Sequence, residues 1–154
     1  MKILVKSFLM VGLFITLFSN NHAQSQSISP QVRVGYYSDL EEYFIGAGLD
    51  ISVLIFTVVP NFEYVFVDEG NFYSLNIDGQ YDVFPLPTIA GYVGGGAGYV
   101  FVKPDGGDSE SRFVLNIIGG VQAKRIPLKP FAQVKYAIIS DIDNQLILTI
   151  GIHF

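Results

Sequence analysis

The sequence contains no cysteine. This absence excludes disulfide bonds, a lipid-modified amino-terminal cysteine and metal sites built from thiolates. Histidine is scarce as well, because His22 and His153 are the only imidazoles available for catalysis or metal binding. After the first 18 residues there is no apolar run long enough for a membrane-spanning helix, although 50% of all residues are hydrophobic. A membrane protein without such helices has to be a closed β-barrel, because every backbone polar group needs a partner inside the hydrocarbon.

The amino-terminal residues have the composition of a secretory signal peptide. Two lysines precede an apolar run over residues 8–18, and the small residue Ala23 stands before a polar segment. The alternative is a membrane anchor, but the run is shorter than the roughly 20 residues that a span needs. We therefore predict a signal peptide over residues 1–23 and a β-barrel domain over residues 24–154.

Cations are few in the predicted mature chain. Without the two lysines of the leader it has 7 basic residues against 14 acidic ones. A surface of that charge argues against nucleic acid as a partner, since nucleic-acid binding depends on Lys and Arg contacts to phosphates.

What the sequence does have is alternation of apolar and polar residues, the pattern of a strand with one apolar face. It is clearest at the end of the chain, where Leu146, Leu148 and Ile150 alternate with small or polar residues and Ile147 is the large apolar exception. Most of the alternating segments have about the length that a tilted strand needs to cross a bilayer. We predict eight strands, over residues 31–38, 42–56, 61–68, 72–84, 89–103, 111–124, 129–140 and 144–154.

The links between these segments alternate in chemistry. Ten of the fourteen acidic residues lie in or at the edges of the odd-numbered links, which are residues 38–42, 67–71, 104–110 and 140–144. The even-numbered links contain proline and almost no acid; they are residues 57–61, 84–88 and 124–130. An up-and-down meander brings all odd links to one end and all even links to the other, whereas a Greek-key sandwich gives no reason for this alternation. The sequence therefore predicts an all-β fold, an eight-stranded antiparallel up-and-down transmembrane β-barrel.

The four acidic residues outside the odd-numbered links lie inside the predicted strands on the polar parity, as do Arg33 and Lys135. Facing lipid near the middle of a membrane would cost about 2–4 kcal/mol for each Arg or Lys, so we expect this parity to face inward. The interior of an eight-stranded barrel is just wide enough for side chains to fill it, which predicts a filled core and no wide pore. Ion pairs are expected there, with glycines such as Gly46 and Gly96 making room and with Asp50 as the partner of Arg33. The predicted interior polar network consists of Arg33, Asp50, Glu63, Asp78, Asp82 and Lys135.

In these features the chain resembles the small outer-membrane β-barrels of the OmpA-like and OmpX-like superfamily. The resemblance covers the whole mature chain and includes the runs PNFEYVF (60–66), YVGGGAGYVF (92–101), PFAQVKY (130–136) and the terminal IHF. It implies a monomer in the outer membrane of a Gram-negative bacterium, with both termini in the periplasm and with membrane lipid and lipopolysaccharide around it. It also implies that Phe154 is the signal presented to the barrel-assembly machinery.

The same resemblance implies a structural or interaction role at the cell envelope. Members of this superfamily include adhesins and stress proteins, but the short loops of this chain argue against adhesion. No peptidoglycan-binding domain is expected after the predicted barrel, so we do not predict an anchoring role.

Two other functional classes remain open from the sequence. A soluble secreted or periplasmic barrel that carries an apolar ligand would need the two parities exchanged, with apolar residues inside. A lipid-modifying barrel enzyme would need a nucleophile beside a base, but His153 lies at the wrong end for this and neither Ser111 nor Ser140 has a histidine beside it.

Two further motifs are candidate ligand sites. The acidic link 104–110 offers oxygen ligands of the kind that calcium prefers, without EF-hand spacing. The glycine cluster at 94–98 is followed by a strand instead of a helix, which is the wrong context for a phosphate-binding loop. We therefore predict no enzyme, and we assign no catalytic residue, cofactor or metal.

Overall fold

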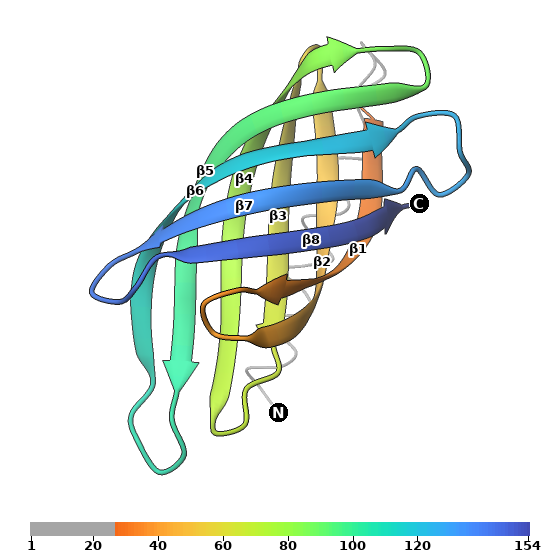
Figure 1. Cartoon of the computed structure of the whole chain (residues 1–154). Coiled ribbons are helices and arrows are strands. Elements are labelled where there is room, and N and C mark those ends of the chain that lie inside the picture. The colour runs from red at the N-terminus through yellow and green to blue at the C-terminus, as the bar shows by residue number, and fades with distance from the viewer. Residues whose placement is uncertain (1–26) are drawn as a thin grey trace, which may run out of the picture.

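Eight antiparallel strands follow one another around a closed barrel in the computed structural model, which describes residues 27–154 (Figure 1). Each strand pairs with the next along the chain, and β8 pairs with β1 to close the barrel. The predicted eight-stranded antiparallel up-and-down barrel is therefore confirmed, whereas the predicted signal peptide lies outside the described residues. Within residues 27–154, no helix is long and apolar enough to cross a membrane. The strands are β1 (Ser27–Tyr37), β2 (Glu42–Val53), β3 (Phe56–Val65), β4 (Asn71–Pro85), β5 (Ile89–Lys103), β6 (Glu110–Ala123), β7 (Phe131–Ile139) and β8 (Gln145–His153).

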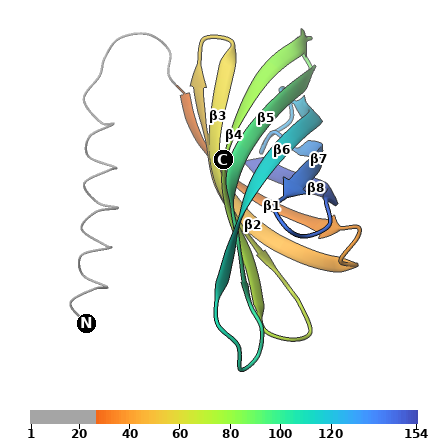
Figure 2. The same ribbon diagram turned by 90° about the vertical axis from the view of Figure 1, so that its left-hand side faces the viewer.

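The two ends of the barrel differ as the alternating links predict. Figure 1 shows the links after β1, β3, β5 and β7 at one end, and the other three links together with the carboxyl terminus at the opposite end. The first set contains eight acidic residues, and Glu42 and Glu110 begin the strands that follow two of them. We call this the acidic end, and the opposite end the turn end. The β3–β4 and β5–β6 hairpins project furthest at the acidic end (Figure 2).

The prediction that the second link lies at residues 57–61 is wrong. The chain reverses at residues 54–55, and Pro60 lies inside β3. A proline has no backbone N–H to donate to a sheet, and the pairing of β2 with β3 reflects this. The two strands pair at Gly48 and Asn61, and again in the same register at Ile51 and Val58. Between these pairs, opposite Pro60, the pairing is interrupted.

The two parities of the strands face opposite sides of the barrel wall. Ile77 is 63% exposed and Ile150 is 61% exposed on the outside, whereas the side chains of Asp78 and Lys135 are each 1% exposed on the inside. The prediction that the polar parity faces inward is confirmed. An apolar interior, which a soluble carrier of an apolar ligand requires, is absent from the turn-end half of the barrel within residues 27–154.

Candidate functional site

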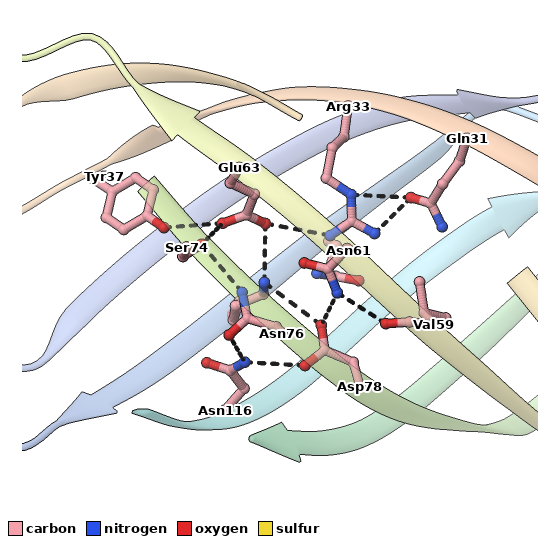
Figure 3. A network of polar contacts seen from close by, with 12 residues as sticks. Gln31, Arg33, Tyr37, Val59, Asn61, Glu63, Ser74, Asn76, Asp78 and Asn116 are labelled. Carbon is pink, nitrogen blue, oxygen red and sulfur yellow. Dashed lines mark hydrogen bonds and ion pairs between the residues drawn. The ribbon is translucent and has the colours of Figure 1, made fainter. Parts of the chain in front are cut away.

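Two cations and two acids meet in the barrel interior, each from a different strand. Glu63 of β3 accepts from both cations, with 3.3 Å between its Oε1 and Arg33 Nη1 and 3.0 Å between Oε1 and Lys135 Nζ. Lys135 Nζ also lies 3.6 Å from Oδ2 of Asp78 on β4. All four side chains are at most 1% exposed. We call these four residues the ion network; Figure 3 labels Arg33, Glu63 and Asp78 among its members.

A glycine on β2 makes the central ion pair possible. Gly46 lies opposite Arg33 of β1 on one side and opposite Glu63 of β3 on the other. A Cβ atom at residue 46 would lie only 3.1 Å from Cγ of Arg33 and 3.1 Å from Cγ of Glu63. The two long side chains therefore meet across β2 in space that any other residue would occupy.

Neutral side chains satisfy the remaining polar atoms of the two acids. Tyr37 Oη donates to Glu63 Oε2 at 2.9 Å, and Ser74 Oγ donates to the same oxygen at 3.4 Å. Asp78 accepts from the side-chain amides of Asn61 and Asn116, at 2.8 Å and 3.0 Å. Each carboxylate thus has hydrogen bonds in addition to its ion pair, which is the condition under which buried charges are tolerated.

The Arg33 guanidinium has a neutral partner as well. The side-chain oxygen of Gln31, two residues earlier on the same face of β1, accepts from Arg33 Nε at 3.0 Å and from Nη2 at 2.5 Å. The guanidinium carbon also lies 5.8 Å from the centre of the Phe131 ring, in cation–π range.

Asp50 is not the partner of Arg33, and that part of the prediction is wrong. Asp50 lies opposite Ser29 in the β1–β2 register, four residues along the strand from the position of Arg33, or about 13 Å. It accepts instead from His153 Nε2 at 2.8 Å and from Gln31. Asp50 therefore reaches Arg33 only through Gln31.

Asp82 lies outside the ion network. Its side chain is 39% exposed at the turn end and forms an ion pair with Lys124, at 3.0 Å between Oδ2 and Nζ. The structure thus brings together four of the six predicted network residues, joins Asp50 to them through Gln31, and leaves Asp82 at the rim. The neutral partners were not predicted from the sequence. Most of them lie on the same polar parity as the charged residues, and this shared parity is the signal that could have identified them.

The acidic-end half of the interior has a different composition. A cluster of buried residues packs there, with Tyr37 edge-on to the rings of Phe44 and Phe72 at 5.5 Å and 5.8 Å between ring centres. We call this cluster the apolar plug; it consists of Tyr37, Phe44, Val65, Phe72, Val100, Val114, Ala137, Ile139 and Ile147. Tyr37 belongs to both groups, since its hydroxyl contacts Glu63.

A cavity of about 10 Å³ lies where the apolar plug meets the ion network. Its lining includes Glu63 and Lys135 of the ion network and Val114 and Ile147 of the apolar plug. A cavity of this size has room for about one water molecule.

The geometry around His153 does not assemble a nucleophile and a base. Its ring nitrogens contact Asp50, the Lys129 carbonyl oxygen at 2.9 Å and the Gln122 side chain at 3.2 Å, all at the turn end. None of these groups is a nucleophile that a histidine could activate. Within residues 27–154, no three Asp, Glu or His side chains are grouped closely enough to hold a metal ion.

Comparison with solved structures identifies the same architecture in bacterial outer-membrane proteins. Neisserial surface protein A superimposes with a TM-score of 0.66 at 14% identity, covering 84% of this chain and 98% of that one. The N-terminal β-barrel domain of Pseudomonas aeruginosa OprF gives 0.64 at 16% identity, covering 85% and 100%. The attachment invasion locus protein Ail of Yersinia pestis gives 0.51 at 17% identity, again covering 85% and 100%.

Neither a protein-family model nor a curated protein matches the sequence. The structural likeness therefore establishes the fold of the small outer-membrane β-barrels, as the sequence resemblance implied.

Proposed function

We propose that the chain is an integral β-barrel of the bacterial outer membrane, with a structural or interaction role at the cell envelope and no catalytic activity. The observation that carries this proposal is the orientation of the wall: apolar side chains cover the outside, and four charges are enclosed. Exposed apolar surface on this scale is costly in water and favourable against lipid. The shared fold with Neisserial surface protein A and OprF supports the same location.

The packing of the interior supports the proposal that the barrel has a filled core and no wide pore. Towards the turn end, the ion network and its hydrogen-bonding partners extend from strand to strand across the interior. Towards the acidic end, the apolar plug packs between the strands. A hydrated ion entering from the acidic end would have to displace the apolar side chains before it met the first charge.

The orientation we propose puts both termini and the turn end in the periplasm, and the acidic end outside the cell. The partners are then membrane lipid and lipopolysaccharide around a monomer. Phe154, which directly follows β8 and is 62% exposed, would be recognised by the barrel-assembly machinery during insertion. No cofactor is part of the proposal.

Cell fractionation combined with gel electrophoresis of unboiled samples tests the location. We expect the protein in the outer-membrane fraction, with a mobility that changes on boiling because a folded barrel resists detergent. Recovery from the aqueous periplasmic fraction would contradict the proposal. Conductance across planar bilayers tests the absence of a wide pore, since large and stable open channels would be incompatible with an occluded interior.

A further inference from the structure

The turns at one end of the barrel carry exposed apolar side chains where polar residues are usual. Leu54 is 86% exposed and Ile55 is 60% exposed in the β2–β3 turn, and Leu86 is 60% exposed in the β4–β5 link. Ile126 and Leu128 are exposed in the β6–β7 link. Figure 2 shows the β2–β3 and β4–β5 turns as the tips of the barrel at this end. We call links 54–55, 86–88 and 124–130 together the basic rim, for the charges described next.

The charges of the basic rim are all positive. Lys124, Arg125 and Lys129 are exposed in the β6–β7 link, and none of the three links contains an acidic residue. Lys124 is paired with Asp82 of β4, whereas Arg125 and Lys129 have no ion pair with any residue of the described range 27–154. The links at the opposite end contain eight acids, so the charge of the barrel is strongly divided between its two ends.

Two of the three links are joined by a hydrogen bond, and the rim continues into the apolar outer wall. The backbone N–H of Lys124 donates to the Thr88 carbonyl at 2.8 Å, which joins the second link to the third. The rings of Phe56 and Tyr81 lie 5.5 Å apart and connect the β2–β3 turn to β4. Phe56 is itself exposed, so no polar belt separates the apolar wall from the turn tip at this point.

We propose that the basic rim binds anionic phospholipid of the inner leaflet, an inference that rests on the outer-membrane location proposed above. The apolar turn tips enter the boundary between head groups and acyl chains, and Arg125 and Lys129 contact lipid phosphates. Amphipathic surfaces with Lys and Arg beside apolar side chains bind anionic membranes in this way. The turn end is therefore held at the membrane surface and does not project freely into the periplasm.

Two observations favour phospholipid over a protein occupant. The rim is continuous with the outer wall, so the lipid around the wall is already in contact with Phe56 and the neighbouring turn tip. A second copy of the chain docked rim to rim would bring Arg125 and Lys129 against identical cations. Like charges placed together in this way oppose such a dimer.

Because the chain has no cysteine, single labels can measure the depth of the rim directly. The variants Ile55→Cys and Leu86→Cys report on the rim, Ile77→Cys on the middle of the outer wall, and Asp105→Cys on an acidic link. Each is spin-labelled in the full barrel, folded in vesicles of phosphatidylcholine with phosphatidylglycerol, and its exposure to oxygen and to a water-soluble nickel complex is compared. We expect labels at residues 55 and 86 to be more protected from nickel than the label at 105, and less than the label at 77.

The labels also separate failure of this inference from failure of the proposed function. If residue 77 lies in lipid but residues 55 and 86 are as accessible to nickel as residue 105, the barrel spans the membrane and the inference is overturned. If residue 77 is itself accessible to nickel, the membrane location is wrong and the inference falls with it.

The charge requirement is tested by native mass spectrometry of the folded barrel with bound phosphatidylglycerol or phosphatidylcholine. A Lys or Arg near an anionic surface contributes about fivefold in affinity, so Arg125→Gln with Lys129→Gln should lower the preference for phosphatidylglycerol by about 25-fold. The control Lys103→Gln with Arg112→Gln removes the same charge near the acidic end and should leave the preference unchanged. An equal preference in all three proteins, or a dimer in place of lipid adducts, would overturn the inference.

Discussion

The half of the barrel interior towards the turn end contains the buried charges and most of the buried polar side chains, whereas the half towards the acidic end is occupied by aromatic and aliphatic side chains. In the first, Glu63 joins Arg33 and Lys135 by ion pairs of 3.3 Å and 3.0 Å. In the second, Phe44 and Ile147 pack in a cluster whose only hydroxyl belongs to Tyr37. Both halves are buried, and both are enclosed by the same apolar outer wall.

The difference shows that two kinds of interior are compatible with one wall. The apolar plug is stabilised by many dispersion contacts, which are individually weak and do not depend on charge. The stability of the ion network does depend on charge, because a buried charge that loses its partner retains the full cost of its desolvation. We therefore expect charge balance to determine how much free energy of unfolding a substitution removes in the ion network, but not in the apolar plug.

Glu63→Gln should have the largest effect. The change leaves Arg33 without an acidic partner and leaves Lys135 with only Asp78, at 3.6 Å. Breaking a buried ion pair from one side costs about 3–5 kcal/mol, so the free energy of unfolding should fall by that order. Urea titration of the barrel folded in detergent, followed by unboiled gel electrophoresis, measures it.

The matched control is Asp82→Asn. It removes the negative charge of a residue that was also predicted from the sequence to belong to the network. Its side chain is 39% exposed and its partner Lys124 is 38% exposed. A pair screened by solvent contributes at most about 1 kcal/mol. Equal losses of stability in the two variants would mean that burial does not govern the energetics of these acids.

Ile147→Ala tests the apolar plug and should have the next largest effect. Ile147 is 2% exposed, and removing its buried side-chain carbons should lower the free energy of unfolding by about 2–5 kcal/mol. Ile150→Ala on the outer face of the same strand is the control, because its side chain leaves no internal cavity when it is shortened. The same urea titration applies, and a larger loss at residue 150 than at residue 147 would contradict the assignment of the two faces.

The sequence was sufficient for the number of strands, their order, the inward parity and the acidic end, because these follow from alternation and from the chemistry of the links. It was insufficient for the β2–β3 turn. Leu54 and Ile55 have none of the glycine, asparagine or aspartate that marks a short hairpin turn, and Leu54 adopts a positive φ of 58°. Pro60 gave the stronger turn signal but lies within a strand.

The ion-pair partners could not be predicted from the sequence, since they depend on register and on reach across a strand. Arg33 meets Glu63 two strands away, and this contact exists only because Gly46 lies between them. The apolar plug was also missed, although its signal was present. Ile147 interrupts the alternation of the last strand, and this exception is a buried plug residue. Val65 and Val114 are further apolar residues on the inward parity that belong to the plug.

Gly46→Ala should have an intermediate effect and tests whether the ion network depends on that space. The new methyl group would crowd Arg33, Glu63 and the backbone oxygen of Phe62. Overpacking of this kind costs about 1–3 kcal/mol. Gly119→Ala on β6 is the control, because its Cβ would meet no atom within 4 Å. Similar unfolding midpoints for the two variants would show that the network does not need the glycine.

Among substitutions in the ion network itself, the smallest change is expected when charge is removed in balance. Arg33→Met combined with Glu63→Gln leaves Lys135 paired with Asp78 and keeps an acceptor for Tyr37 at residue 63. Replacing a buried ion pair by uncharged groups is often neutral, so the double variant should unfold within about 1–2 kcal/mol of the parent. It should then be more stable than Glu63→Gln alone, although it carries one more substitution. If the double variant is instead as unstable as the single variant, the stability of the network depends on its directional hydrogen bonds more than on its charge balance. The two halves of the interior would then differ chiefly in their need for directional contacts.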